Sequence, residues 1–279
     1  MGPYIQMARP LNCVMSAVAV VLGGMLSVGP EIFQLESVVS ISLAAAAVTL
    51  FVAAGNTLND YEDRYIDIKA HPRRPIPSGR VAPSTARLLA YSLFTFSAVV
   101  GITIDVHTPV PFLFLLINMA VMISYEKKLK GQGIPGNLAI SWLTASLFLF
   151  GALSVGTINP TIIYFTAMAF LSIFMREIAK DIEDADADRG VRQTAPIIFG
   201  EKPCTRLATL SLLSAIILSP MPWLFSLVSQ SYIYIVAAAD VIFIYSIILL
   251  FRGDARRSQN VAKLGMLVSL VAFAFGVFI

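Results

Sequence analysis

The feature of this 279-residue chain that most limits its fold is a series of long apolar stretches separated by charged clusters. Nine stretches are long enough, or nearly so, to cross a bilayer, which needs about 17–25 residues. Their approximate extents are 11–28, 38–58, 84–104, 109–124, 137–154, 161–179, 204–220, 231–251 and 258–278. With 57% hydrophobic and 13% charged residues, the composition is unlike that of soluble globular proteins. We therefore expect an all-α, polytopic membrane protein of nine transmembrane helices.

The distribution of basic residues predicts how these helices are oriented. The 20 Lys and Arg residues fall before the first stretch or around the connections that follow even-numbered stretches. They occur at Arg9 and within 64–87, 127–130, 176–206 and 252–263. Because cytoplasmic loops carry the excess of Lys and Arg, we expect a cytoplasmic N-terminus, an outside C-terminus and a location in the plasma membrane. The net charge of +3 belongs to this pattern, so it does not indicate a nucleic-acid partner.

Two polar motifs repeat at a spacing of 121 residues. The first consists of Asn56, Asp60, Asp63 and Asp67, followed by Pro75 and Gly79. The second consists of Glu177, Asp181, Asp184 and Asp188, followed by Pro196 and Gly200. Along a helix that turns about 100° per residue, these four offsets fall within about 60° of one another. Each motif is therefore expected to project its polar groups from one narrow helical stripe, at the cytoplasmic end of the second or the sixth span.

The spacing of the motifs also indicates an internal repeat. The offset covers four spans, and an even number of crossings preserves orientation in the membrane. We expect two four-helix pseudo-repeats plus a ninth helix around a central cavity. The whole chain, residues 1–279, would form a single integral-membrane domain with cytoplasmic cap loops at about 56–83, 125–136 and 177–203.

Paired acidic stripes in an apolar chain indicate a divalent metal site. Mg²⁺ prefers hard oxygen ligands, keeps several waters, and bridges carboxylates to substrate phosphates. The residues expected to be catalytic are Asp60, Asp63, Asp67, Asp181, Asp184 and Asp188. The expected metal ligands are Asn59, Asp63, Asp67, Asp181, Asp184 and Asp188. The alternative is that both motifs are solvated helix ends with local ion pairs. Glu62, Glu183 and Asp186 point away from the stripes and are interpreted as ordinary solvated residues.

Polar and basic residues near the motifs are candidates for binding phosphate groups. Cationic side chains can neutralise a departing diphosphate or fix an acceptor phosphate. The candidates are Asn56, Arg74, Lys127, Lys128, Lys130, Lys180 and Arg192. The positive-inside pattern alone also accounts for the basic members of this set.

Four further polar residues are candidates for lining a cavity. Arg9 can contact an acceptor phosphate or serve as an interfacial anchor, and Asn12 and Asn137 can line a cavity or join helices. Asp240 lies mid-span, where an ionisable residue is a functional candidate, with a hydrogen-bonded packing contact as the alternative. Small residues such as Gly23 and Gly24 can leave room for an apolar chain or pack helices together.

The motifs resemble those of a known family. Asn-Asp-x-x-Asp-x-x-x-Asp at 59–67, Arg-Pro-Ile-Pro-Ser-Gly at 74–79 and Asp-x-x-Asp-x-x-x-Asp at 181–188 resemble the UbiA superfamily of intramembrane prenyltransferases. The sequences at 176–184 and 136–137 most resemble its archaeal branch, the digeranylgeranylglyceryl phosphate synthases. One departure is that many members carry Tyr-x-x-x-Lys after the fourth helix, whereas Leu129 lies four places after Tyr125 here.

This resemblance implies an activity. An isoprenoid diphosphate donor would bind through Mg²⁺, and a geranylgeranyl group would pass to the hydroxyl of geranylgeranylglyceryl phosphate, a lipid-like acceptor. Two alternatives remain open, an aromatic prenyltransferase of quinone biosynthesis and, from another class, a cation-coupled transporter. Membrane lipids are expected partners, and the sequence does not indicate the oligomeric state.

Overall fold

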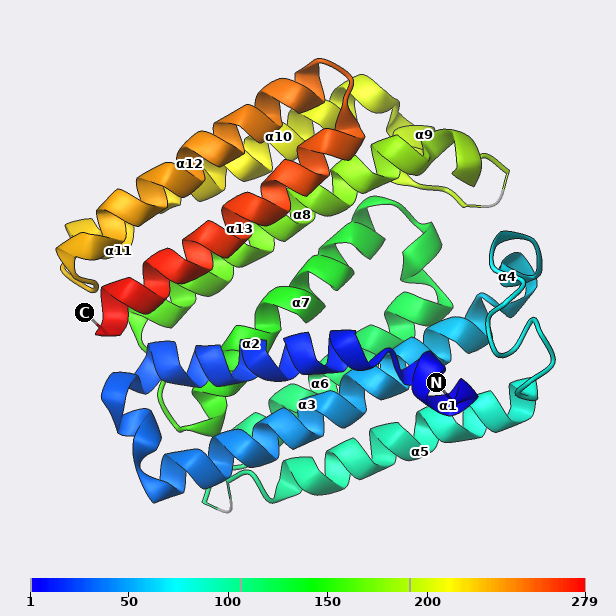
Figure 1. Cartoon of the computed structure of the whole chain (residues 1–279), viewed down its shortest axis with the longest axis horizontal. Coiled ribbons are helices and arrows are strands. Elements are labelled where there is room, and N and C mark those ends of the chain that lie inside the picture. The colour runs from blue at the N-terminus through cyan, green and yellow to red at the C-terminus, as the bar shows by residue number, and fades with distance from the viewer. Residues whose placement is uncertain (1, 106, 191, 279) are drawn as a thin grey trace. The chain divides into compact units, whose positions relative to one another are not determined.

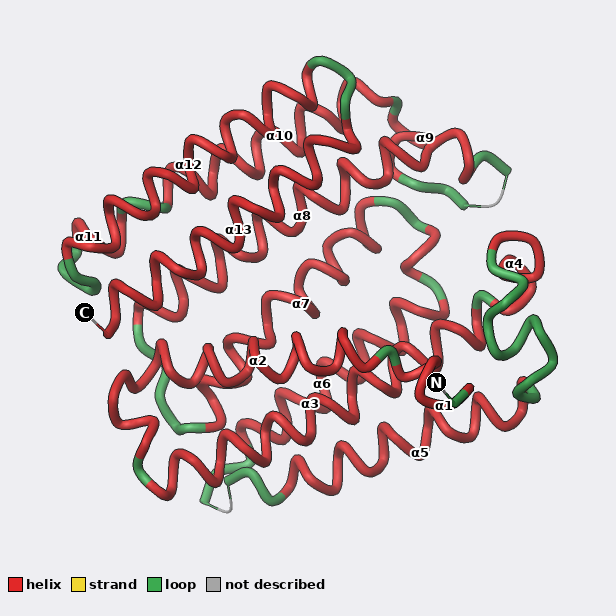
Figure 2. Tube along the Cα trace, in the orientation of Figure 1, coloured by secondary structure: helices red, strands yellow, loops and turns green. Residues whose placement is uncertain are grey.

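The computed structural model describes residues 2–105, 107–190 and 192–278, and within these ranges the chain is helical without strands (Figures 1 and 2). The helices are α1 (Pro3–Ala8), α2 (Pro10–Val28), η1 (Gly29–Phe33), α3 (Leu35–Glu62), α4 (Arg64–Ala70), α5 (Pro83–Ile102), α6 (Val110–Lys127), η2 (Leu129–Gly131), α7 (Ile134–Ser154), α8 (Pro160–Asp188), α9 (Ala195–Phe199), α10 (Glu201–Leu218), α11 (Met221–Leu224), α12 (Gln230–Phe251) and α13 (Ala255–Phe278).

In the described part of the chain, nine helices are long and apolar enough to cross a membrane. They are α2, α3, α5, α6, α7, α8, α10, α12 and α13, with η1 extending α2 and α11 extending α10. The predicted all-α, nine-span class is therefore confirmed. Helices α4 and α9 lie in the two long connections that the sequence presents as cap loops. Short helix α1 precedes the first span and was not expected.

The chain divides into two compact units. The first contains residues up to 127 together with 147–157, and the second contains 128–146 together with 158 onward. Helix α7 contributes residues to both. The single-domain organisation and the pseudo-repeat remain predictions.

In the first unit, α2 and the end of α7 approach closely at glycines. An added Cβ at Gly23 would lie 2.0 Å from the Phe148 carbonyl oxygen, and one at Gly151 would lie 1.9 Å from that of Val20. These glycines therefore serve helix packing, and Gly23 does not leave space for a substrate chain. In the same unit, Phe51 of α3 meets Phe94 of α5 with ring centroids 6.0 Å apart.

In the second unit, α8 packs against α10 and α13, and α12 packs against α13 (Figure 1). Met175, Ile178, Leu212 and Phe243 belong to one buried apolar cluster. Burial of one face of α8 up to Ala179 fixes the rotation of that helix. The acidic residues that follow along α8 are therefore presented in a defined direction.

The first polar motif does not lie on one continuous helix, so that expectation was wrong. Helix α3 ends at Glu62, and α4 begins after Asp63. The Arg64 guanidinium donates to the Tyr61 carbonyl oxygen at 2.6 Å and lies over the Tyr61 and Tyr65 rings. Because that carbonyl would accept a hydrogen bond from the Tyr65 N–H in a continuous helix, the Arg64 side chain competes with continuation of α3. Asp67 is consequently carried by a separate short helix.

The helix contact at Gly151 gives a first prediction. Gly151→Ala places a methyl group against the Val20 carbonyl, and overpacking of this kind costs about 1–3 kcal/mol. We expect a clear loss of thermal stability for the detergent-solubilised protein. Gly131→Ala is the matched control, because its new Cβ would have nothing within 4 Å. Equal melting temperatures for both variants would contradict the close approach.

Candidate functional site

The first polar motif contains two buried carboxylates, both paired with arginine. Asp60 and Asp67 are only 4% and 3% exposed. Arg9 Nη2 lies 2.6 Å from Asp60 Oδ1, and Arg74 Nη1 lies 2.6 Å from Asp67 Oδ2 and 3.6 Å from Asp60 Oδ1. Burial of a carboxylate is costly unless a positive charge compensates it. The two guanidinium groups therefore supply positive charge that the sequence had assigned to metal ions.

Arg9 reaches the motif from a strained position between α1 and α2. Its backbone is left-handed, with φ 51° and ψ 73°, a conformation that costs a non-glycine residue about 1–3 kcal/mol. The Nδ2 group of Asn56 donates to the carbonyl of the preceding Ala8 at 2.9 Å. These contacts attach the N-terminal segment to the first motif. Asn56, a candidate for phosphate binding, thus makes a backbone contact.

Asn59 is held in one orientation from both ends of its amide. Its Oδ1 accepts a hydrogen bond from Arg9 Nη2 at 2.8 Å, and its Nδ2 donates to Glu126 Oε2 at 2.8 Å. The carboxylate of Glu126 can only accept, so the amide oxygen faces the side on which Arg9 contacts Asp60. Glu126, at the end of α6, was missed because no motif or spacing distinguishes it from other charged loop residues.

The second motif lies on one continuous helix, α8, as its spacing predicts. Asp181 Oδ2 accepts a hydrogen bond from Asn137 Nδ2 of α7 at 2.9 Å. Glu177 is buried and pairs with Arg176, whereas Asp184 and Asp188 are half-buried. Asn137, predicted as a cavity-lining residue, therefore orients the Asp181 carboxylate of the second motif.

The acids interpreted as lying outside the stripes have other surroundings. Asp186 is exposed and lies 3.4 Å from Arg189. Glu183 contacts Gln259 and lies 3.8 Å from Arg256. Both acids therefore make surface contacts.

Two connections meet in the second unit. The Gln193 amide donates to the Gly131 carbonyl at 3.1 Å, and an added Cβ at Gly133 would lie 2.9 Å from the Ala195 nitrogen. Gly133 has φ +66°, which favours glycine and allows this approach. Lys130 and Arg192, both half-buried, flank the contact in sequence.

The remaining candidate residues differ in exposure. Lys127, Lys128 and Lys180 are exposed, and Lys127 Nζ lies 5.7 Å from the Tyr91 ring centroid. Asn12 is exposed on α2, while Asp63 is half-buried at the break between α3 and α4.

Asp240 is part of a hydrogen-bonded helix contact in the second unit. Its Oδ2 accepts from Ser219 Oγ at 2.6 Å, and the Tyr232 hydroxyl donates to the Ser219 carbonyl at 2.7 Å. This arrangement joins α12 to the end of α10. It favours the packing interpretation of Asp240 over a direct role in the reaction.

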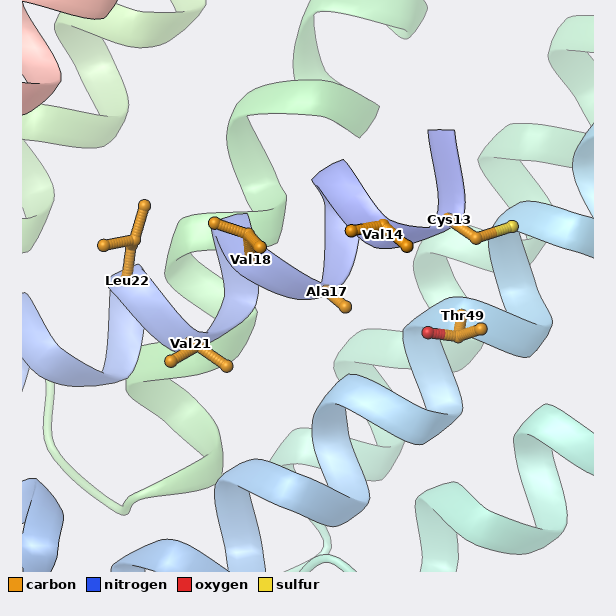
Figure 3. A pocket seen from close by; sticks show the side chains of 7 residues that line it. All are labelled: Cys13, Val14, Ala17, Val18, Val21, Leu22 and Thr49. Atoms are coloured by element: carbon orange, nitrogen blue, oxygen red, sulfur yellow. The ribbon is translucent and has the colours of Figure 1, made fainter. Parts of the chain in front are cut away.

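An apolar groove of about 320 Å³ runs along α2 in the first unit (Figure 3). Its lining residues are Cys13, Val14, Ala17, Val18, Val21 and Leu22 of α2 and Thr49 of α3. Cys13, its first residue, lies one helical turn after Arg9 and donates its amide to the Arg9 carbonyl at 3.3 Å. The groove therefore begins close to the first motif and has the lining that a hydrocarbon chain requires.

The donor chemistry of the first motif suits Mg²⁺. Among the described residues, no three His, Cys, Asp or Glu side chains come together as a ready metal-binding group. The Asp60 and Asp67 carboxylates and the Asn59 amide oxygen are nevertheless hard donors that already face cationic groups. The oxygen donors and their negative charge therefore suit Mg²⁺. In this structure the guanidinium groups of Arg9 and Arg74 contact these donors.

Comparisons with known proteins identify the family. Residues 17–273 match the model of the UbiA prenyltransferase family, and the chain belongs to that family. The digeranylgeranylglyceryl phosphate synthase of Methanopyrus kandleri is 35% identical over 276 residues, covering 98% of each protein. A solved structure described as digeranylgeranylglyceryl phosphate synthase in membranes superposes with a TM-score of 0.86 at 30% identity, covering 99% of this chain and 97% of the other.

A more distant structure shares the fold. A UbiA homologue from Archaeoglobus fulgidus, bound to GPP and Mg²⁺, has a TM-score of 0.73 at 16% identity and covers 97% of this chain and 99% of its own. The resemblance drawn from the motifs is therefore confirmed, and the protein is a membrane-embedded enzyme that transfers prenyl groups. This assignment sets aside the transporter alternative.

The contact between Asn59 and Glu126 gives a second prediction. Glu126→Ala removes one of the two contacts that hold the Asn59 amide, and loss of an orienting partner next to a metal ligand, the role predicted for Asn59, typically costs about 10- to 100-fold in activity or metal affinity. We expect kcat/KM to fall by that order, with partial recovery in Glu126→Gln, whose side-chain oxygen still accepts. Glu62→Ala, which removes a nearby carboxylate outside this contact, is the control. Wild-type kinetics for Glu126→Ala would refute the orienting role.

Proposed function

We propose that the enzyme transfers a geranylgeranyl group from geranylgeranyl diphosphate to the free hydroxyl of geranylgeranylglyceryl phosphate. The product carries the second ether bond of an archaeal membrane lipid. The observation that carries this proposal is the first motif, where hard oxygen donors and arginine guanidinium groups lie together at one end of α3. Such a site suits a reaction with a metal-bound diphosphate and an anionic acceptor. Full-length similarity to digeranylgeranylglyceryl phosphate synthases supports the choice of substrates.

Mg²⁺ is the proposed cofactor. The residues that would hold it are Asn59, Asp63 and Asp67 in the first motif and Asp181, Asp184 and Asp188 in the second. When bound, the ion supplies positive charge to the diphosphate leaving group. The distant homologue bound to GPP and Mg²⁺ supports this choice.

The residues of the chain bind the phosphate groups and orient the ligands. Asp60 is contacted by both Arg9 and Arg74, so its proposed role is to position their guanidinium groups. Lys127, Lys128, Lys130, Lys180 and Arg192 are the other proposed cations. As the allylic C–O bond breaks, these cations and Arg74 stabilise the charge that develops on the diphosphate.

The acceptor step needs little help from an acid or base. The acceptor hydroxyl oxygen attacks the electron-poor allylic carbon and forms the ether bond, while its proton passes to the departing diphosphate or to water. The apolar groove along α2 supplies a surface for a geranylgeranyl chain, beginning one turn from Arg9. A dry, apolar wall also limits competing attack by water on the allylic carbon.

We also propose that the active site lies on the cytoplasmic side of the plasma membrane. All 20 Lys and Arg residues lie before the first span or around connections that the positive-inside rule assigns to the cytoplasm. Both acidic motifs stand beside these connections. The phosphate groups of both substrates would then face the cytoplasm.

The choice of acceptor is tested by a paired assay. Purified protein in detergent micelles, supplied with Mg²⁺ and labelled geranylgeranyl diphosphate, should form a diether phosphate from geranylgeranylglyceryl phosphate. Added EDTA should remove this activity and fresh Mg²⁺ restore it, because the diphosphate loses its counter-charge without metal. A prenylated product from 4-hydroxybenzoate instead would move the enzyme to quinone biosynthesis.

The acidic motifs are tested by substitution. Asp63→Ala and Asp184→Ala should each lower kcat at least about 100-fold, since metal ions contribute several kcal/mol to charge stabilisation. Asp186→Ala, which removes an exposed acid two residues from Asp184, should retain activity. All three proteins should elute alike in gel filtration. Full turnover by Asp63→Ala and Asp184→Ala would remove the basis for the metal assignment.

A further inference from the structure

A second cavity of about 320 Å³, lined mostly by polar residues, lies in the first unit beside the first motif. It is lined by Gln6 of α1, Ala70 at the end of α4, and the following residues His71, Pro72, Arg73 and Arg74. Of these lining residues, the reaction described so far uses only Arg74. Its volume lies at the lower end of the range for small-ligand sites, which is about 300–1,000 Å³.

The lining of this cavity is rich in hydrogen-bond donors. Arg73 is exposed, and within the described ranges its side chain makes no ion pair or hydrogen bond. Arg74 approaches Asp67 and Asp60 through Nη1 alone, which leaves Nε and Nη2 outside that ion pair. Two guanidinium groups on adjacent residues therefore have donors available to an anion.

Arg80 fixes the rim of the cavity. Its Nη2 donates to Gln6 Oε1 at 3.0 Å and to the Arg73 carbonyl at 2.6 Å, and its Nε donates to Ser78 Oγ at 3.0 Å. Because arginine only donates, it turns the Gln6 oxygen toward itself and leaves the Gln6 Nε2 group as a donor. The rim of the cavity therefore exposes N–H donors. The same Arg80 contacts join α1 to the loop before α5.

We propose that this cavity binds the phosphate monoester of the acceptor lipid. A phosphate monoester is close to dianionic at neutral pH and offers three oxygens, which match the paired guanidinium forks and the Gln6 amide. Arg74 links the cavity to Asp67 and Asp60, so a phosphate bound here is held beside the first motif. The inference rests on the proposed function and assigns acceptor recognition to residues separate from the acidic ligands.

The same chemistry can come from the acceptor or from an anionic lipid of the bilayer, and kinetics separate these sources. Arg73→Ala should raise KM for geranylgeranylglyceryl phosphate about 10- to 100-fold, the effect of losing charge-assisted hydrogen bonds to phosphate. The KM for geranylgeranyl diphosphate should stay unchanged. Turnover of the phosphate-free acceptor geranylgeranylglycerol should be equally slow in wild type and variant. Lys69→Ala, an equal change of charge on α4 outside the cavity, should behave as wild type.

Three results would overturn the proposal. One is an unchanged acceptor KM in Arg73→Ala. Another is an equal loss of activity with both acceptors that appears only in nanodiscs containing phosphatidylglycerol, which would assign the cavity to bilayer lipid. The third comes from thermal unfolding, which does not depend on turnover. Glycerol phosphate should raise the melting temperature of the wild type and of Lys69→Ala but not of Arg73→Ala, and no shift in the wild type would count against the site.

Failure of the proposed function looks different from failure of this inference. If the wild type forms no diether from geranylgeranylglyceryl phosphate, the acceptor assignment is wrong, while the thermal shift still reports on the cavity. If the wild type forms the diether and Arg73→Ala has the same acceptor KM, only the cavity assignment is wrong.

Discussion

The pairing of buried carboxylates with arginine organises the first half of this enzyme. Asp60, at the end of α3, and Asp67, on α4, are almost fully buried, and they require positive charge nearby. Arg9 supplies it from the N-terminal segment, and Arg74 supplies it from the loop before α5. Through these two contacts, segments that are distant in sequence are held at one place, where the apolar groove and the donor-rich cavity both begin.

The predictable parts of the fold are those set by the bilayer and by local periodicity. Apolar length predicted each of the nine spans, because a membrane helix must satisfy its backbone internally and must be long enough to cross. The second motif lies along α8 as its spacing predicts. In the first motif, the Arg64 side chain contacts the Tyr61 carbonyl, and this local competition for a helical hydrogen bond was not visible in the hydrophobic pattern.

The sequence predicted which types of residue form the candidate site, but not which side chains contact one another there. The spacing selected the acidic residues, yet nothing in it indicated that Arg9 contacts a residue 51 positions later. Glu126 and Gln6 have roles only because the fold brings α6 beside α3 and α1 beside the loop before α5. Such partners depend on tertiary structure, and a single sequence contains no pattern that reveals them.

The ion pairs of Arg9 and Arg74 also bear on how the enzyme is made in the cell. A cluster of bare carboxylates would oppose its own burial during insertion, and folding would then have to wait for metal. With the negative charge already compensated from within, the first unit can reach its folded form during biosynthesis and bind the proposed Mg²⁺ afterwards. The chain therefore separates the time of its folding from the time of its activation.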